Sequence, residues 1–134
     1  MLTIIAGSRS ARECDVLFAL NKCPWRDSIS SVISGTAYGA DRFGERWAKG
    51  NGIEVIRFPA DWDLYGRSAG PSRNKEMAEN ADALIAIWDG VSRGTKDMLE
   101  RAKKASLRTM VYFYKENRLE NLEFKANQLS LVGV

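Results

Sequence analysis

Short apolar runs alternate with amphipathic segments along the chain. Five runs have the length and composition of buried strands, at residues 2–6, 29–34, 54–58, 83–88 and 109–114. Between them, apolar positions recur with the period of a helix from Ser10 onward and over residues 40–49, 73–80 and 95–105. Strands separated by helices in this order call for right-handed crossovers and a parallel sheet. The pattern therefore predicts an α/β fold.

Local signals mark where the first two helices begin or end. Ser10 and Glu13 have the spacing of a capping box, which places the start of the first helix at Ser10. Asn51 and Gly52 stop the second helix, as a left-handed cap would. We expect these two helices to flank the second strand.

Two segments do not follow the alternation. Residues 59–72 are rich in polar residues, glycine and proline and are longer than a simple connector, which is typical of a functional loop. In residues 115–134, Leu119, Leu122 and Phe124 suit a short helix, whereas residues 129–134 suit an added edge strand. The pattern leaves both interpretations of the tail open.

The length of 134 residues bounds the architecture. We expect one Rossmann-like domain over residues 1–134, a three-layer sandwich around a mainly parallel five-stranded sheet, with residues 115–134 as a C-terminal extension. In the common strand order 3-2-1-4-5, the topological switch point lies between strands one and four. Ligands of such sheets bind in the crevice at that point.

Three strand-to-helix turns share one composition. Each apolar run stops at glycine and is followed by hydroxyl side chains and an arginine: TIIAGSR at residues 3–9, VISGTAYGADR at 32–42 and LIAIWDGVSRGT at 84–95. In a parallel sheet these turns lie at the carboxyl edge of the strands, where backbone N–H groups and helix N-termini can bind anions. The phosphate of a nucleotide or nucleotide-like ligand is the leading candidate.

The residues of these turns and of the polar segment supply candidate ligand contacts of four kinds. Glycines allow close approach, hydroxyls donate hydrogen bonds, arginines neutralise phosphate, and aromatic rings stack on a base. The candidates are Gly7, Gly35, Gly39, Gly90 and Gly94; Ser8, Thr36 and Thr95; Arg9 and Arg93; and Tyr38, Trp62 and Tyr65. Trp62 and Tyr65 lie in the polar segment, with Gly66 and Gly70 after them as possible hinges, which suggests a lid.

Three carboxylates are candidates for acid–base chemistry: Asp41, Asp89 and Asp97. Asp41 and Asp89 are also candidate ligand contacts. Asp89 follows a buried strand, where carboxylates often face ligand hydroxyls, although an Asx turn explains the same position. Glu45 has a structural explanation, because it can pair with Arg42 or Arg46.

Three stretches resemble a known family. They are SGTAYGAD at residues 34–41, FPADWDLYGRSAGPSRNKEM at 58–77 and RGTKDM at 93–98, and they are similar to the YspA-type branch of the SLOG superfamily. Relatives of this branch are the LOG cytokinin-activating enzymes and the DNA-processing protein DprA. The resemblance covers residues 2–114. It implies a Rossmann-like sheet that binds nucleotides or nucleotide-derived ligands, with some members cleaving the N-glycosidic bond of a nucleoside monophosphate and others sensing signals in phage conflict.

The resemblance also assigns roles to individual residues. It implies that Gly35, Gly39, Gly94 and Thr95 bind phosphate, and that Arg73 and Lys75 correspond to basic residues of the hydrolase branch. The catalytic glutamate of the hydrolases, three residues beyond Thr95, falls here on Met98. Asp97 lies one position earlier, which on a helix turns it by about 100° and aims it elsewhere.

Composition narrows the function further. There is no histidine, which removes the usual general base near neutral pH and most catalytic zinc sites, so we expect neither a metal nor a cofactor.

Apolar runs are only of strand length and Met1 leads directly into a strand, which predicts a cytoplasmic protein without a membrane partner. Cys14 and Cys23 are expected to be reduced thiols. The net charge of +3 without a basic run argues against nucleic acid as a partner.

Three functions follow from these observations. The first is binding of a nucleotide-derived small molecule by a sensor or sequestering protein, for which Met98 in place of the glutamate is the supporting feature. The second is hydrolysis of an N-glycosidic or phosphate bond. The third is binding of single-stranded nucleic acid. A homo-oligomer stays open in each case.

Overall fold

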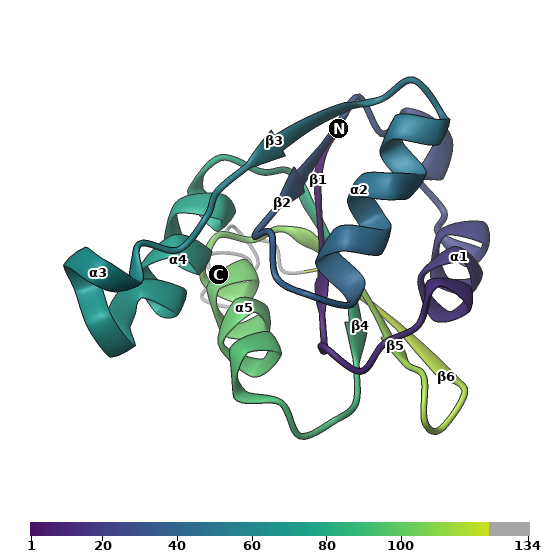
Figure 1. Ribbon diagram of the computed structural model, residues 1–134. Coiled ribbons are helices and arrows are strands. Elements are labelled where there is room, and N and C mark those ends of the chain that lie inside the picture. The colour runs from purple at the N-terminus through teal and green to yellow at the C-terminus, as the bar shows by residue number, and fades with distance from the viewer. Residues whose placement is uncertain (124–134) are drawn as a thin grey trace, which may run out of the picture.

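Six strands form one mixed sheet in the computed structural model, which describes residues 1–123 (Figure 1). The strands are β1 (Leu2–Gly7), β2 (Ser31–Ser34), β3 (Glu54–Arg57), β4 (Ala83–Trp88), β5 (Arg108–Phe113) and β6 (Arg118–Glu123). Their order is β3-β2-β1-β4-β5-β6, and the first five are parallel. The expected order is therefore confirmed, and the α/β arrangement is consistent with a Rossmann-like fold.

Helices cover both faces of the sheet. The main ones are α1 (Glu13–Lys22), α2 (Ala40–Gly50), α4 (Ala69–Glu79) and α5 (Arg93–Lys104). Figure 1 shows α1 and α2 on one face and α4 and α5 on the other. Alternate residues of β4 point to opposite sides, so Ile85 packs in the cluster under α1 and α2 while Leu84 packs under α4 and α5. Within residues 1–123, no helix is long and apolar enough to cross a membrane.

The expectation of five strands is wrong, because the tail adds β6 antiparallel to β5. Leu119 and Leu122 have the spacing of a helix face, but in a strand they point to opposite sides. Leu119 accordingly packs against the core on one face of the sheet and Leu122 against the core on the other. The helical interpretation is therefore wrong for residues 118–123. Phe124 and residues 129–134 lie outside the described part of the chain.

The expected loop at residues 59–72 is also wrong, since most of it is helical. It contains α3 (Trp62–Tyr65), a 3-10 turn (Gly66–Ser68) and the first turn of α4. The Asp61 carboxylate accepts a hydrogen bond from the backbone N–H of Leu64 at 3.1 Å and so caps α3. Pro71 falls in the first turn of α4, where its missing N–H has no intrahelical partner to lose. The glycine and proline that suggest a loop are thus compatible with helix ends.

The start of α1 differs from the expected capping box. The helix begins at Glu13, and the backbone N–H of Arg12 donates to the Asp15 carboxylate at 2.9 Å. Ser10 lies outside the helix, where its hydroxyl bonds the Tyr114 hydroxyl. The remaining boundaries differ from expectation by a few residues, and Gly52 has the expected left-handed conformation with φ of +67°.

Candidate functional site

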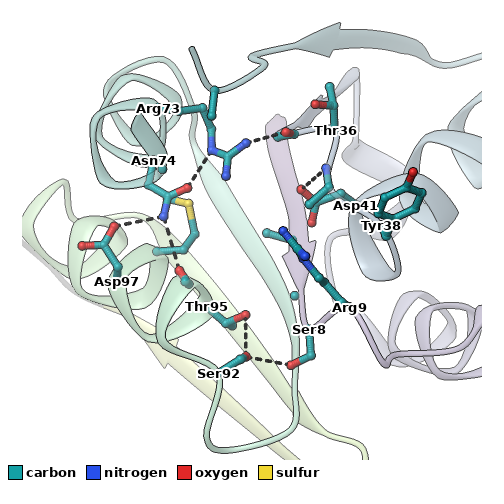
Figure 2. A pocket seen from close by; sticks show the side chains of 18 of the residues that line it. Ser8, Arg9, Thr36, Tyr38, Asp41, Arg73, Asn74, Ser92, Thr95 and Asp97 are labelled. Carbon is teal, nitrogen blue, oxygen red and sulfur yellow. Dashed lines mark hydrogen bonds between the residues drawn. The ribbon is translucent and has the colours of Figure 1, made fainter. Parts of the chain in front are cut away.

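A cavity of about 710 Å³ opens at the carboxyl edge of the sheet (Figure 2). The loops after β1, β2 and β4 line it, together with residues from α4 and the first turns of α2 and α5. Pockets for small molecules have volumes of about 300 to 1,000 Å³, so this cavity has room for a nucleotide-sized ligand. The three glycine-containing turns thus meet around one space, at the switch point of the sheet.

Ser8 joins the loop after β1 to the loop after β4. Its backbone N–H donates to the Ile87 carbonyl at 2.9 Å, and its hydroxyl accepts the N–H of Asp89 at 2.9 Å. The side chain is buried, with a residue exposure of 2%. Ser8 therefore holds the two loops together at the base of the cavity.

A chain of hydroxyls runs from Ser8 toward the first turn of α5. Ser8 Oγ lies 2.9 Å from Ser92 Oγ, which donates to Thr95 Oγ1 at 3.2 Å (Figure 2). In this direction each hydroxyl donates to the next, and the Thr95 hydroxyl keeps its own proton for a further acceptor. Because Thr95 lines the cavity, a ligand oxygen is a suitable acceptor.

The N-terminus of α5 also borders the cavity. Ser92 is its N-cap residue, yet the Ser92 side chain makes no capping hydrogen bond. Arg93, Gly94 and Thr95 form the first turn, and all three line the cavity. A Cβ built on Gly94 would meet no atom within 4 Å. Backbone N–H groups of an uncapped first turn attract anions, and Gly94 leaves space for one to approach.

Arg73 is the cation held most firmly at the cavity. It projects from α4, its Nε donates to Asn74 Oδ1 at 3.0 Å, and its Nη1 donates to the Gly35 carbonyl. Figure 2 shows the third guanidinium nitrogen pointing toward the middle of the cavity. Burial lowers the pKa of Arg73 from its usual value, while Asp41 and Asp97 act in the opposite direction. A guanidinium fixed in this way is a preformed site for phosphate or carboxylate oxygens.

Asn74 connects α4 to α5 and was not among the predicted site residues. It accepts from Arg73 through Oδ1 and donates through Nδ2 to Asp97 Oδ2 at 2.9 Å and to the Gly94 carbonyl at 3.3 Å. It is buried, with 5% of the residue exposed. Nothing in the sequence distinguished Asn74 from a surface residue, because two of its three partners, Gly94 and Asp97, come from a different helix.

The candidate acid Asp97 lines the cavity, but its oxygens already have partners. One accepts from Asn74, and the other lies 3.5 Å from Arg101 Nε, one turn further along α5. Met98 also borders the cavity and is almost completely buried, in the apolar cluster between α5 and the sheet. The site therefore has methionine where the hydrolase resemblance expects a carboxylate.

Asp41 lies in the first turn of α2 with 4% of the residue exposed. Its carboxylate accepts a hydrogen bond from the backbone N–H of Ala37 at 3.2 Å. Burial raises the pKa of Asp41 to about 6, and the Ala37 N–H and the nearby Arg73 offset this only in part. Asp41 is therefore the one candidate acid in the cavity whose pKa is raised toward neutrality.

The loop after β2 has an unusual backbone conformation. Thr36 has φ of +67°, a value rare for residues with a Cβ, and strain of this kind concentrates at functional sites. Its N–H donates to Ser34 Oγ at 3.0 Å, and the Ser34 hydroxyl donates to Glu45 at 2.6 Å. Glu45 is paired with Arg57, with Nε and Oε1 2.9 Å apart, rather than with Arg42 or Arg46. The structural role expected for Glu45 is correct, and its expected partners are wrong.

Two glycines of this loop are needed for close packing. A Cβ on Gly35 would lie 2.6 Å from Arg73 Nη1 and 2.9 Å from Asp41 Oδ2. Gly39 has φ of +80°, and its Cβ would lie 2.5 Å from the carbonyl oxygens of Ser8 and Arg9. Gly35 therefore admits the arginine to the cavity, while Gly39 packs the loop after β2 against the loop after β1.

Asp89 forms an Asx turn, which is one of the two explanations that the sequence allows for a carboxylate at this position. Its Oδ1 accepts the backbone N–H groups of Val91 at 2.9 Å and Ser92 at 2.8 Å. Burial by itself would raise the pKa of Asp89, but these two N–H groups hold it below its usual value. Asp89 lines the cavity as a carboxylate that shapes the loop after β4.

The structure brings most of the predicted ligand-binding residues to the cavity. Those that line it are Gly7, Ser8, Arg9, Gly35, Thr36, Tyr38, Asp41, Trp62, Arg73, Asp89, Arg93, Gly94 and Thr95. Four others do not line it: Gly39, Tyr65, Lys75 and Gly90. Lys75 lies on the outer side of α4, where it pairs with Glu79 at 3.8 Å.

Comparison with known proteins finds sequence similarity to a protein family and to a phage protein. Residues 1–65 match the YspA, cpYpsA-related SLOG family. This SLOG match includes the loops after β1 and β2. The chain is also 38% identical over 82 residues to the Gene 61 protein of Mycobacterium phage D29, with 57% of this chain and 66% of the phage protein covered. The match thus spans slightly less than two thirds of the phage protein. No solved structure matches the chain significantly.

The raised pKa of Asp41 predicts a specific dependence of stability on pH. The folded protein keeps this proton up to about pH 6, whereas the unfolded chain releases it near 3.8, so stability falls as the pH rises through this window. Asp41→Asn removes the effect. The variant should gain up to about 3 kcal/mol relative to wild type between pH 4 and pH 6, at about 1.4 kcal/mol for each pKa unit.

Urea unfolding of both proteins at a series of pH values measures this difference. The exposed Asp63→Asn variant is the matched control, and its difference from wild type should not change with pH. A difference for Asp41→Asn that is equally constant from pH 4 to pH 7 would contradict the burial argument.

Proposed function

We propose that this protein binds a nucleotide or a nucleotide-derived small molecule in the cavity and acts as a sensor or sequestering protein. The observation that carries the proposal is the fixed position of Arg73, whose guanidinium faces the cavity near the uncapped N-terminus of α5. A phosphate group suits both features, because it accepts charge-assisted hydrogen bonds from arginine and backbone hydrogen bonds from a helix N-terminus.

Other groups would complete the phosphate site. The Thr95 hydroxyl has a proton to donate, and Arg9 and Arg93 line the mouth of the cavity. Within residues 1–123, neither arginine forms an ion pair with a carboxylate. A ligand phosphate would supply the missing negative charge. Lys75 is removed from this proposal, because it lies outside the cavity and pairs with Glu79.

Two aromatic rings offer stacking surfaces for a base. Tyr38 is 63% exposed and Trp62 is 57% exposed, and both line the cavity. The guanidinium of Arg42 lies 4.0 Å from the centre of the Tyr38 ring, which orients that ring. Stacking on an aromatic side chain contributes about 1 to 3 kcal/mol per base, so one of these rings is enough to place a nucleotide. Tyr65 does not line the cavity and is left out of this role.

Binding without hydrolysis fits the acid groups present. Met98 cannot transfer a proton, and Asp97 is held by Asn74 and Arg101. Asp89 is occupied by its Asx turn. Hydrolysis of an N-glycosidic bond is the second candidate function, and the raised pKa of Asp41 favours it, because an acid with pKa of about 6 can donate a proton near neutral pH.

Gly94→Val tests the phosphate site directly. A Cβ at this position meets no atom within 4 Å, so the protein should stay folded, yet the valine side chain would fill the approach to the first turn of α5. We expect the affinity for nucleoside monophosphates to fall by about tenfold or more, equal to about 1.4 kcal/mol. Isothermal titration calorimetry with AMP, GMP, CMP and UMP measures it.

Gly50→Val is the matched control for that variant. Gly50 is also helical, and a Cβ there likewise meets no atom within 4 Å, but it does not line the cavity. Its affinity should equal that of wild type. If no monophosphate binds the wild type, or if Gly94→Val binds as tightly as wild type does, the proposed site is wrong.

A turnover assay separates the binding protein from the hydrolase. Wild type is incubated with the same monophosphates, and free base and ribose phosphate are followed by chromatography. We expect ligand to bind with no release of base above the rate without protein. Release of base that is lost in Asp41→Asn and kept in Asp97→Asn would instead make Asp41 the general acid of a hydrolase.

A further inference from the structure

A second hollow lies beside the cavity, where α2 meets the loop after β2 and the end of β3. It has a volume of about 440 Å³ and is lined by Thr36, Arg42, Glu45, Arg46, Lys49 and Arg57. Arg42, Arg46 and Lys49 follow one another at four and three positions along α2, which places them on one face of the helix. Arg57 comes from the end of β3. Four cations and one carboxylate therefore border one hollow.

The single carboxylate does not neutralise the hollow. Glu45 is turned toward the protein interior, where it accepts the Ser34 hydroxyl at 2.6 Å, and its side chain is only 12% exposed. It also pairs with Arg57, with Nη2 and Oε1 2.9 Å apart. The Glu45 carboxylate is thus paired with Arg57 and hydrogen-bonded to the buried Ser34 hydroxyl.

Two of the remaining cations have no carboxylate partner. Arg46 pairs with Glu13 of α1, with Nη1 and Oε2 3.3 Å apart. In the part of the chain that the structure describes, Arg42 and Lys49 form no ion pair. Arg42 donates only to the Thr36 carbonyl, at 3.4 Å. The hollow consequently keeps an excess of positive charge that an anion would neutralise.

The hollow continues directly from the main cavity. Thr36 and Arg42 line both, and Tyr38, which stacks on Arg42, lines the main cavity next to them. Along α2, Arg42 and Lys49 are about 10 Å apart at 1.5 Å for each residue. A ligand that fills the cavity and passes over Tyr38 would therefore reach a second set of cations.

We propose that the hollow binds a second phosphate, so that the preferred ligand of the protein is a nucleotide-derived molecule with two separated phosphates, such as a dinucleotide. This inference rests on the proposed function, because the first phosphate is the one held at Arg73 and α5. Arg42 lines both the cavity and the hollow, and the face of the Tyr38 ring that Arg42 does not cover would stack on the nucleoside that joins the two phosphates. Lys49 serves only the second phosphate, since it lines the hollow and not the cavity.

The experiment compares two probes by calorimetry at 150 mM salt. AMP has one phosphate, and pApA, a dinucleotide with a 5′-phosphate, has two that are separated by one nucleoside. Wild type should bind pApA about tenfold more tightly than AMP, or better. Lys49→Glu should remove most of that gain and leave AMP binding within about twofold of wild type, because the screening length of about 8 Å limits the effect to its surroundings.

Lys104→Glu is the matched control, since Lys104 is also an exposed lysine in the last turn of a helix and lines neither hollow. It makes the same change in net charge and should alter neither affinity by more than about twofold. The melting temperatures of both variants show that they are folded.

Three outcomes would overturn the second phosphate site while leaving the proposed function intact. In the first, AMP binds but pApA binds no more tightly. In the second, Lys49→Glu and Lys104→Glu weaken pApA equally. In the third, a single strand of 20 nucleotides binds far more tightly than pApA and loses affinity in Lys49→Glu, which assigns the hollow to nucleic acid. Absence of binding by AMP, GMP, CMP and UMP alike in wild type would overturn the proposed function itself.

Discussion

The candidate site depends on the hydrogen bonds of one guanidinium. Arg73 connects α4 to the loop after β2 through the Gly35 carbonyl, and through Asn74 it connects to Asp97 and the first turn of α5. These contacts set the spacing between the two helices and the loop that enclose the cavity. They also take a charged group partly out of water, which is unfavourable unless partners compensate for the lost hydration.

The protein's own groups compensate only in part for the hydration that Arg73 and Asp41 lose on burial. Arg73 influences Asp41, but within the described residues the two form no direct ion pair, and burial leaves the pKa of Asp41 raised and that of Arg73 lowered. A ligand phosphate beside Arg73 would supply a closer anion than Asp41 does. Binding of that phosphate would then offset the thermodynamic cost of holding these charged groups in the cavity. That relation between strain in the free protein and affinity for the ligand is common at functional sites.

The sequence predicted the parts of the fold that follow from periodicity. The five parallel strands, their order and the convergence of the turns at Gly7, Gly35 and Gly94 all depend on local patterns and on the handedness of crossovers. Residues 59–72 and 118–123 were predicted wrongly, because glycine and proline at helix ends resemble loop residues, and because leucines three apart suit a helix as well as a strand.

The sequence did not predict three features of the site, because each depends on contacts that side chains make and not on local periodicity. Asn74 accepts a hydrogen bond from its neighbour Arg73 and donates one to Asp97 of another helix. The left-handed conformation of Thr36 depends on the Ser34 hydroxyl, which in turn donates to Glu45. Lys75 lies two positions from Arg73, yet it points to the opposite side of α4 and pairs with Glu79. A shift of two helical positions decides whether a basic residue faces the cavity or the solvent, and periodicity within a polar segment does not reveal which.

An NMR titration of the backbone amides and arginine Nε–H groups with AMP tests the central claim most directly, because it reports on all three loops and on Arg73 at once. We predict that the changes in chemical shift concentrate in residues 7–10, 35–39 and 89–95 and in the Arg73 side chain, with α1, β5 and β6 unaffected. Changes centred on those distant elements, or shifts in one loop without the other two, would contradict the account.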